Sequence, residues 1–540
     1  MNAIDEHTLA IPQGQGELKD LAVKLGQYVK QPQEEAHQLR SLLFAQYLGG
    51  SVASAMVNAT QPFLVSIPYL SQFGGIAKAG AQMLRASKDA VSFAKTKTTG
   101  DAGLDAAMKE HVNVISTQEI HQMQAQARGS AVLISGDGTK AGDAYATATN
   151  ALSRLQFAWG KVFSVAEQFN RRSTFIAAYR MAVERGEADP GAFAADAVNQ
   201  TQFVYSKANR PQWARGAVGS TLFTFKSFTI SYLELLGRMW NAGAAGSLER
   251  AAGRKATLLA LGVLMLASGA DGLPFEDNVD DVVDGFMQRV MGRNFSLKRL
   301  RHGLLQQAFG DDLGHAMEKG LTGIPGVPID VSGRLGMNRV IPGTGLLVKK
   351  QDYTKDLTDI LGPVGDLATR GLQATASVAQ GDFGAAAKVV QAQAVRNFIT
   401  GWDALMTGTY HDDKGRVVVP VSALEAAAKM IGFQPQTVAR IQEASGQVMQ
   451  EVELTKIVKG ELQAKYAQAL VGNDEEGMAA VRAAIVAWNK ANPEAPMALN
   501  RPAIAKLARE LRESKAERLA HTAPAAMRQR VREQLAGAVQ

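Results

Sequence analysis

The chain has 540 residues, of which 46% are hydrophobic and 20% charged, a composition that is typical of folded proteins and excludes global disorder. It contains no cysteine, which excludes disulfides, thiolate nucleophiles and cysteine-ligated zinc or iron–sulfur centres. The formal net charge of +7 favours contact with nucleic acid or anionic lipid, although an excess of this size in a long chain also serves solubility.

Helix-forming residues dominate the sequence. Alanine is abundant, Leu, Glu, Lys and Gln fill surface-type positions, and alternation of β-branched residues is rare. We therefore expect an all-α protein, built as an elongated multi-helix bundle. Residues 1–20 carry acidic side chains and no continuous apolar stretch, which is not the pattern of a secretory signal.

The N-terminal helical region, residues 1–135, contains a long segment without any charge. This segment covers residues 41–77 and is interrupted by Asn58, Gln61, Pro62 and Pro68. The interruptions predict two helical pieces rather than one continuous span. Small residues spaced four apart at its centre, Gly49, Gly50, Ala53 and Ser54, favour close helix contacts in a protein core or in lipid.

The central region, residues 136–320, begins with the clearest helical periodicity in the chain. A seam with 3,4 spacing runs through Leu152, Leu155, Trp159, Val162, Ala166, Phe169, Ser173, Ile176, Arg180 and Val183. It predicts a helix of about nine turns. Gly186 and the pair Asp189-Pro190 mark its end.

The segment 219–240 combines aromatic residues with very few charges. Its three charged residues, Lys226, Glu234 and Arg238, fall on one stripe at multiples of four. The rest of the circumference is apolar, so we expect a helix that protein or lipid covers on most sides.

Residues 256–270, ATLLALGVLMLASGA, form an uncharged run between a basic and an acidic flank. A helix of this length rises roughly 22 Å, against about 30 Å of hydrocarbon in a bilayer. A buried core helix is the expectation, with conditional membrane insertion as the alternative. For the acidic run that follows, 276–284, apolar residues at helical spacing favour an amphipathic helix with an acidic face over a calcium loop.

Glycine and proline break the helical pattern in residues 321–350, which we interpret as an ordered loop or a domain boundary. Helices return in 351–435, together with one small β-hairpin near 409–420. Its turn is Asp413-Lys414-Gly415, and the return strand contains three valines, 417–419. Residues 436–540 are a basic, helical C-terminal tail.

The sequence contains few patterns that indicate an enzyme. The eight histidines show no zinc spacing, and no phosphate-binding loop or dinucleotide fingerprint is present. We expect no catalytic residue, no metal and no cofactor. A pair of carboxylates for glycoside cleavage remains open, because such pairs meet in space rather than along the chain.

The basic tail carries arginines that alternate with glutamates between residues 509 and 518, which favours a solvated face over a DNA-binding one. Arg528, Arg530 and Arg532 are the candidates for contact with nucleic acid.

Several stretches together resemble one class of phage protein. They are NATQPFLVSIPYL (58–70), FNRRSTFIAAYR (169–180), TQFVYSKANRPQWARGAVGSTLFTFKSF (201–228), ADGLPFEDNVDDVVD (270–284), GIPGVPIDVSGRLGMNRVIPGTG (323–345) and LGPVGDLA (361–368). The chain resembles, over roughly residues 40 to 435, the C-terminal helical region of bacteriophage large polyvalent proteins and the internal virion, or ejection, proteins of short-tailed phages.

This resemblance implies a virion protein that is made in the bacterial host cytoplasm, packed in the virion interior, and ejected with the genome into the host envelope. Members often carry a murein transglycosylase or a polymerase module, and one branch has a Pro-Leu-x-Arg-Phe-Gly motif. None of these is present in this sequence. We therefore carry over no enzymatic activity.

We thus expect a non-enzymatic structural component of DNA ejection that acts as a homo-oligomer beside other virion proteins or the portal, without a small-molecule substrate. The residues expected to contact membrane or partners are Leu42, Phe44, Tyr47, Phe63, Phe223, Phe225, Phe228, Tyr232, Trp240, Leu258 and Leu264. Two alternatives stay open: a peptidoglycan-cleaving enzyme of the virion, and a capsid-interior protein that binds DNA non-specifically.

Overall fold

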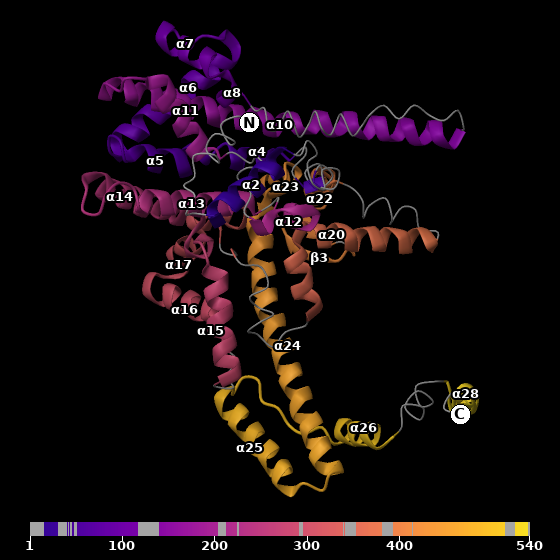
Figure 1. The fold of residues 1–540 in the computed structure, drawn as a ribbon. Coiled ribbons are helices and arrows are strands. Elements are labelled where there is room, and N and C mark those ends of the chain that lie inside the picture. Colours follow the sequence, from indigo (N-terminus) through magenta and orange to yellow (C-terminus); the bar gives the residue numbers. More distant parts are fainter. Residues whose placement is uncertain are drawn as a thin grey trace. The chain divides into compact units, whose positions relative to one another are not determined.

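The computed structural model describes residues 16–30, 40, 43, 46–47, 51–116, 140–203, 212–223, 226–290, 295–337, 340, 353–380, 392–412, 414–513 and 524–537. Helices make up nearly all of this part of the chain, and two small sheets accompany them (Figure 1). The all-α class expected from the sequence is confirmed. The chain forms two compact units, one of residues 1–276, 302–342 and 357–441 and one of residues 277–301, 343–356 and 442–540.

In chain order, the helices up to residue 272 are α2 (Gly16–Lys30), α4 (Val52–Asn58), the π-helix η1 (Pro62–Ser66), α5 (Ile67–Ser71), α6 (Ile76–Thr96), α7 (Ala102–Glu110), α8 (Val112–Ile115), α10 (Lys140–Arg185), α11 (Pro190–Thr201), η3 (Gln212–Ala214), α12 (Gly216–Phe223), α13 (Ser227–Trp240), α14 (Leu248–Ser268) and η4 (Ala270–Gly272).

Those that follow are α15 (Glu276–Val290), α16 (Leu297–Phe309), α17 (Asp311–Lys319), η5 (Gly320–Gly323), α18 (Ser332–Leu335), α20 (Tyr353–Ala379), α22 (Gln393–Thr407), α23 (Ala423–Met430), α24 (Gln436–Val471), α25 (Glu475–Ala491), α26 (Arg501–Arg512), η6 (Ala525–Met527) and α28 (Arg528–Gly537).

Polar residues cap the starts of many helices. The Asp189 carboxylate accepts a hydrogen bond from the backbone amide of Ala192, and Pro190 occupies the first turn of α11. Ser247 caps α14 through the amide of Arg250. Ser422 and Glu425 form a reciprocal capping box at α23. Each side chain satisfies an amide that has no partner within its own helix.

The first core lies where α10 crosses α6 and α11. Its residues come from α5, α6, α7, α8, α10 and α11, and they include Leu70, Met83, Leu104, Met108, Phe175, Ile176 and Met181. Alanines fill most of the remaining positions, so the helices approach closely. Two ion pairs at 2.7 Å, Arg180 with Asp89 and Lys78 with Glu184, join α10 to α6 at the edge of this core.

α10 ends before Gly186, as the sequence predicts, but its 46 residues make about 13 turns rather than the nine expected. The predicted seam describes its buried side only in part. Residues 173–178 are buried on every side, whereas Val162 and Val183 of the seam are exposed. Neighbours surround the middle of α10, and there a single-face pattern does not apply.

A second core lies between α13 and α14. Tyr232, Leu235 and Met239 of α13 pack against Ala256, Ala260 and Leu264 of α14. The Tyr232 hydroxyl donates to the carbonyl of Ala260 at 3.4 Å, which partners the one polar group of that side chain inside the core.

Both sheets are antiparallel pairs. The expected hairpin is present as β2 (Thr409–His411) and β3 (Val417–Pro420), with Tyr410 opposite Val419. Lys414 and Gly415 form part of its turn, whereas Asp413 lies outside the described residues. The second pair, β1 (Ile329–Asp330) with β4 (Gln434–Pro435), ties the segment expected to be a loop to the start of α24.

The second unit has its own small core. Ile504 and Ala508 of α26 pack against Ala467 of α24, and Tyr466 and Leu507 lie beside them. α25 follows α24 after Asn473, a residue with positive φ, and is capped by Asp474.

Candidate functional site

Apart from Leu264, the buried side chains of α14 are small, and several of its large apolar side chains are exposed. Gly253, Ala256, Thr257, Ala260, Leu264, Ala267 and Ser268 are its buried residues. Leu258 and Leu266 are 60% and 68% exposed, and Met265 is exposed as well. Helices in lipid commonly turn small residues toward other helices and large apolar residues outward. There, close packing of the backbones rather than burial of apolar surface holds the helices together.

α14 is also longer than the sequence indicated. It has 21 residues because Ser247 caps it and the helix begins at Leu248, eight residues before Ala256, so it rises about 31 Å. Within the described ranges it is the one helix that is long and apolar enough, by length and composition, to cross a membrane. Its most apolar stretch of 18 residues has a mean hydropathy of 1.3, and 39% of that stretch is buried. The estimate of a helix too short to span a bilayer was wrong on this point.

The N-terminal end of α14 is basic and lies beside an exposed aromatic ring. The guanidinium of Arg254 lies 5.1 Å from the ring centre of Trp240 at the end of α13, a cation–π distance. Arg250 donates to the carbonyls of Asn241 and Gly243 and so fixes the loop between the helices. Tryptophan and arginine side by side are typical of the boundary between membrane and water.

α13 and α14 touch backbone to backbone. A Cβ atom on Gly253 would lie 2.0 Å from the carbonyl oxygen of Met239, so only glycine fits at this crossing. Thr257 follows one turn later, and its hydroxyl donates to the Gly253 carbonyl at 3.0 Å.

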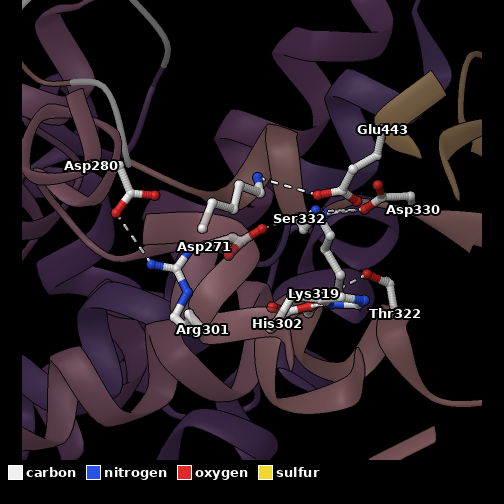
Figure 2. Close-up of polar contacts among 11 residues, drawn as sticks. Asp271, Asp280, Arg301, His302, Lys319, Thr322, Asp330, Ser332 and Glu443 are labelled. Carbon is white, nitrogen blue, oxygen red and sulfur yellow. Dashed lines mark hydrogen bonds and ion pairs between the residues drawn. The ribbon is translucent and has the colours of Figure 1, made fainter. Parts of the chain in front are cut away.

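The C-terminal end of α14 is held by a cluster of glycines. Gly269 has a φ of +74°, and a Cβ there would lie 1.9 Å from the carbonyl oxygen of Glu318. A Cβ on Gly320 would lie 2.6 Å from the carbonyl of Leu266. Beside these contacts, Lys319 Nζ binds Asp271 Oδ2 at 3.0 Å, and His302 Nδ1 lies 2.6 Å from Glu318 Oε2 (Figure 2).

α15 is a helix with one acidic and one apolar side, as the sequence predicts, but the acidic side is the buried one. Asn278, Asp280, Asp281 and Asp284 are buried. Val279, Val282 and Phe286 are 52%, 51% and 55% exposed. The carboxylates have polar partners: Asp284 accepts the amide of Leu297 at 2.7 Å, and Asp280 lies 3.5 Å from Arg301 (Figure 2).

α22 repeats the pattern of α14. Its buried residues are Asn397, Gly401 and Ala404. A Cβ on Gly401 would lie 2.4 Å from the amide nitrogen of Met430 in α23, so the two helices are in direct backbone contact. The large residues Phe398, Ile399, Trp402, Leu405 and Met406 are exposed, with Phe398 and Trp402 stacked at 6.4 Å.

Polar side chains fill the space around the π-helical turn η1. Ser66 bonds Thr174 at 2.9 Å and Thr201 at 3.2 Å, and Gln202 donates to Ser66 at 3.2 Å. All four residues are buried. Hydroxyl and amide groups of this kind join helices through interhelical hydrogen bonds, and π-turns recur at functional sites.

The structure separates the expected contact residues into two groups. Trp240 and Leu258 are exposed. Tyr232 and Leu264 lie in the second core, Phe228 packs against its edge, and Phe63 is half-buried against the first core. Burial raises the pKa of Tyr232. In this form of the protein these four residues are packing residues.

Tyr47 is half-buried and donates to Asp366. Burial alone would raise the pKa of Asp366, but hydrogen bonds from Arg370 and Tyr47 outweigh it and hold that pKa below its usual value. Leu42, Phe44 and Phe225 lie outside the described residues, as does the side chain of Phe223. Arg528, Arg530 and Arg532 are exposed on α28.

The sequence did not single out the exposed stripe of α22 or the outward apolar side of α15. The available signal was the spacing of small residues, Asn397, Gly401 and Ala404, opposite a run of aromatic and large aliphatic residues. Among the described residues, no group of three or more His, Asp and Glu side chains is arranged to hold a metal ion. No family model, no curated protein and no solved structure matches this chain.

Proposed function

We propose that this chain is a non-enzymatic structural protein of a phage particle, of the ejection class, that contacts the host membrane after it leaves the capsid with the genome. The observation that carries the proposal is the inverted packing of α14, with Gly253, Ala256 and Ala260 inward and Leu258 and Leu266 outward. In water such a face costs free energy in proportion to its exposed apolar area, and a bilayer removes that cost.

The inversion is repeated on separate elements, which supports the proposal. α22 exposes Phe398 and Trp402 while it packs through Gly401. α15 exposes Val279 and Phe286 while it buries its carboxylates. Isolated apolar residues on a surface are ordinary, but repeated stripes at helical spacing mark contact surfaces.

The charges beside α14 suit an anionic membrane. Arg254 and Lys255 are exposed at the N-terminal end of the helix, and Trp240 lies next to Arg254. A basic residue near an anionic surface gains about 1 kcal/mol of attraction.

Vesicle flotation tests the membrane role. The full chain should float with vesicles of anionic phospholipid, and the double variant Leu258→Ser/Leu266→Ser should float far less. Leu372→Ser is the matched control, because Leu372 is an equally exposed leucine on α20. Equal flotation of all three proteins would show that α14 is not the contact surface, and a chain that never floats would contradict the membrane role.

The virion role needs a separate measurement. Mass spectrometry should find the chain in purified, genome-filled particles and not in particles that have ejected their DNA. Its absence from filled particles would contradict the proposal. A cleared band in a peptidoglycan zymogram would favour the enzymatic alternative instead.

A further inference from the structure

A groove of about 580 Å³ runs along the seam between α13 and α14. Its walls are formed by Leu233, Leu236, Trp240, Leu261, Met265 and Pro274, and Gly237 of α13 and Gly262 of α14 also line it. The volume lies within the range of small-molecule sites. The groove belongs to the same helix pair as the membrane surface and borders the outward face, since Gly262 lies one turn from both Leu258 and Leu266 on α14.

Two glycines keep the groove open. A Cβ atom added to Gly237 or to Gly262 would meet no other atom within 4 Å. Neither residue has a positive φ, and glycine inside a helix lowers its stability relative to alanine. These glycines are therefore not required by backbone conformation or by close packing, in contrast to Gly253. What they provide is space.

The walls offer almost nothing to a hydrogen-bonding ligand. The hydroxyl of Thr257 donates to the carbonyl of Gly253, and the amide nitrogen of Asn241 donates to the carbonyl of Gly237. An extended peptide in the groove would leave its backbone N–H and C=O groups without partners, which is costly. A hydrocarbon chain has no such groups.

One end of the groove is cationic. Arg254 lies one turn before Thr257 and on the same stripe of α14 as Leu261 and Met265. Its guanidinium lies over the ring of Trp240, and within the described part of the chain it has no carboxylate partner. A charge at one end of an apolar groove is complementary to an anionic amphiphile.

We propose that this groove binds the acyl chain of a single anionic lipid, with the acidic headgroup at Arg254 and the chain extending past Trp240 toward Met265 and Pro274. The inference deepens the membrane role proposed above and rests on it for the source of the lipid. The groove between the two helices would bind one lipid molecule, whereas the outward face of α14 would contact the bilayer.

A bromine-labelled fatty acid, used below the concentration at which it forms micelles, tests the site without any bilayer. Bromine quenches a tryptophan that it touches, so binding should quench part of the fluorescence of the full chain. That part should vanish in Trp240→Phe. Gly262→Leu and Gly237→Leu should each weaken binding by at least about tenfold, because leucine fills the groove.

Gly460→Leu is the matched control, since Gly460 is an exposed helical glycine in α24 that also has no atom within 4 Å of an added Cβ. It should bind like the unmodified chain. Arg254→Gln should weaken binding of the fatty acid several-fold and leave binding of the uncharged alcohol of the same chain length unchanged. Circular dichroism should show the same helix content in every variant.

Three results would overturn the site. They are quenching that survives Gly262→Leu, quenching that is unaffected by Trp240→Phe, and a concentration-dependent dimer that Gly262→Leu disrupts, which would assign the groove to a second copy of the chain. Vesicle flotation separates this site from the membrane role. If Gly262→Leu binds fatty acid normally but Leu258→Ser/Leu266→Ser fails to float, the groove site fails while the membrane role stands.

Discussion

Lys319 Nζ lies 3.0 Å from Asp271 Oδ2, and the two side chains are only 12% and 6% exposed. The pair joins η4, just after α14, to the end of α17. A carboxylate and an ammonium withdrawn from water to this degree depend strongly on each other, because neither keeps its full hydration.

Lys319→Met should therefore lower the free energy of unfolding by about 3–5 kcal/mol, since it removes the ammonium from a carboxylate that stays buried. Urea denaturation would measure the loss. The double variant Asp271→Asn/Lys319→Met should recover a large part of it. A single variant as stable as the unmodified chain would contradict a mutually dependent buried pair.

The two kinds of glycine on α14 should respond in opposite ways. Gly253→Ala places a methyl group 2.0 Å from the Met239 carbonyl and should cost at least about 1–3 kcal/mol, because α13 and α14 must separate. Gly262→Ala meets no atom within 4 Å and should gain about 0.5–1 kcal/mol from helix propensity. Thermal denaturation compares the two, and equal shifts of the melting temperature would refute the backbone contact.

The buried hydroxyls near η1 should be energetically coupled. Ser66→Ala and Thr174→Val should each cost about 1–3 kcal/mol, since each leaves a buried partner of the 2.9 Å bond without it. In a double-mutant cycle the combined loss should be smaller than the sum. Thr375→Val, at an exposed threonine in α20, is the control and should change stability by less than about 0.5 kcal/mol. Strict additivity would disprove the coupling.

Glu425 should make the stability of the first unit depend on acidic pH. Burial acts to raise its pKa, but hydrogen bonds from Thr437 and Ser422 outweigh burial and hold the pKa below the ordinary 4.5. A depressed carboxyl pKa stabilises the fold fully above the unfolded value and loses that contribution as pH falls through the folded value.

Unfolding followed from pH 7 to pH 2 should accordingly show a loss of stability that begins near pH 4.5. Glu425→Gln should lower stability at neutral pH by about 1–2 kcal/mol, the scale of a lost helix cap, and flatten the profile in that window. A variant with the same pH profile as the unmodified chain would assign the acid sensitivity to other carboxylates.

Local signals in the sequence were sufficient for much of the fold. Gly186, Asp189 and Pro190 define the end of α10 and the start of α11 through φ, side-chain capping and ring geometry, which act over a few residues. The valine-rich return strand of the hairpin was likewise predictable from a few neighbouring residues. What these signals decide is where an element begins and ends.

Which side of a helix is buried depends on residues far away in the sequence, so local signals do not predict it. Asp280 and Asp284 of α15 are buried because Arg301 and the amide of Leu297 partner them, and nothing in the periodicity of 276–290 reveals those partners. The candidate site shows the same limit. Trp240 and Leu258 are exposed while Tyr232 and Leu264 are buried, although all four are large side chains on two apolar helices.

The two ends of α14 are fastened unequally. Backbone contacts at Gly269 and Gly320 fix its C-terminal end, and the Lys319–Asp271 pair reinforces them. Its N-terminal end is held by the close contact of Gly253 with α13, by the Arg254–Trp240 pair and by the bonds of Arg250 to an exposed loop. A displacement of α14 that keeps the contacts of Gly269 and Gly320 would therefore pivot at its C-terminal end and move its basic end and the loop 241–247 farthest.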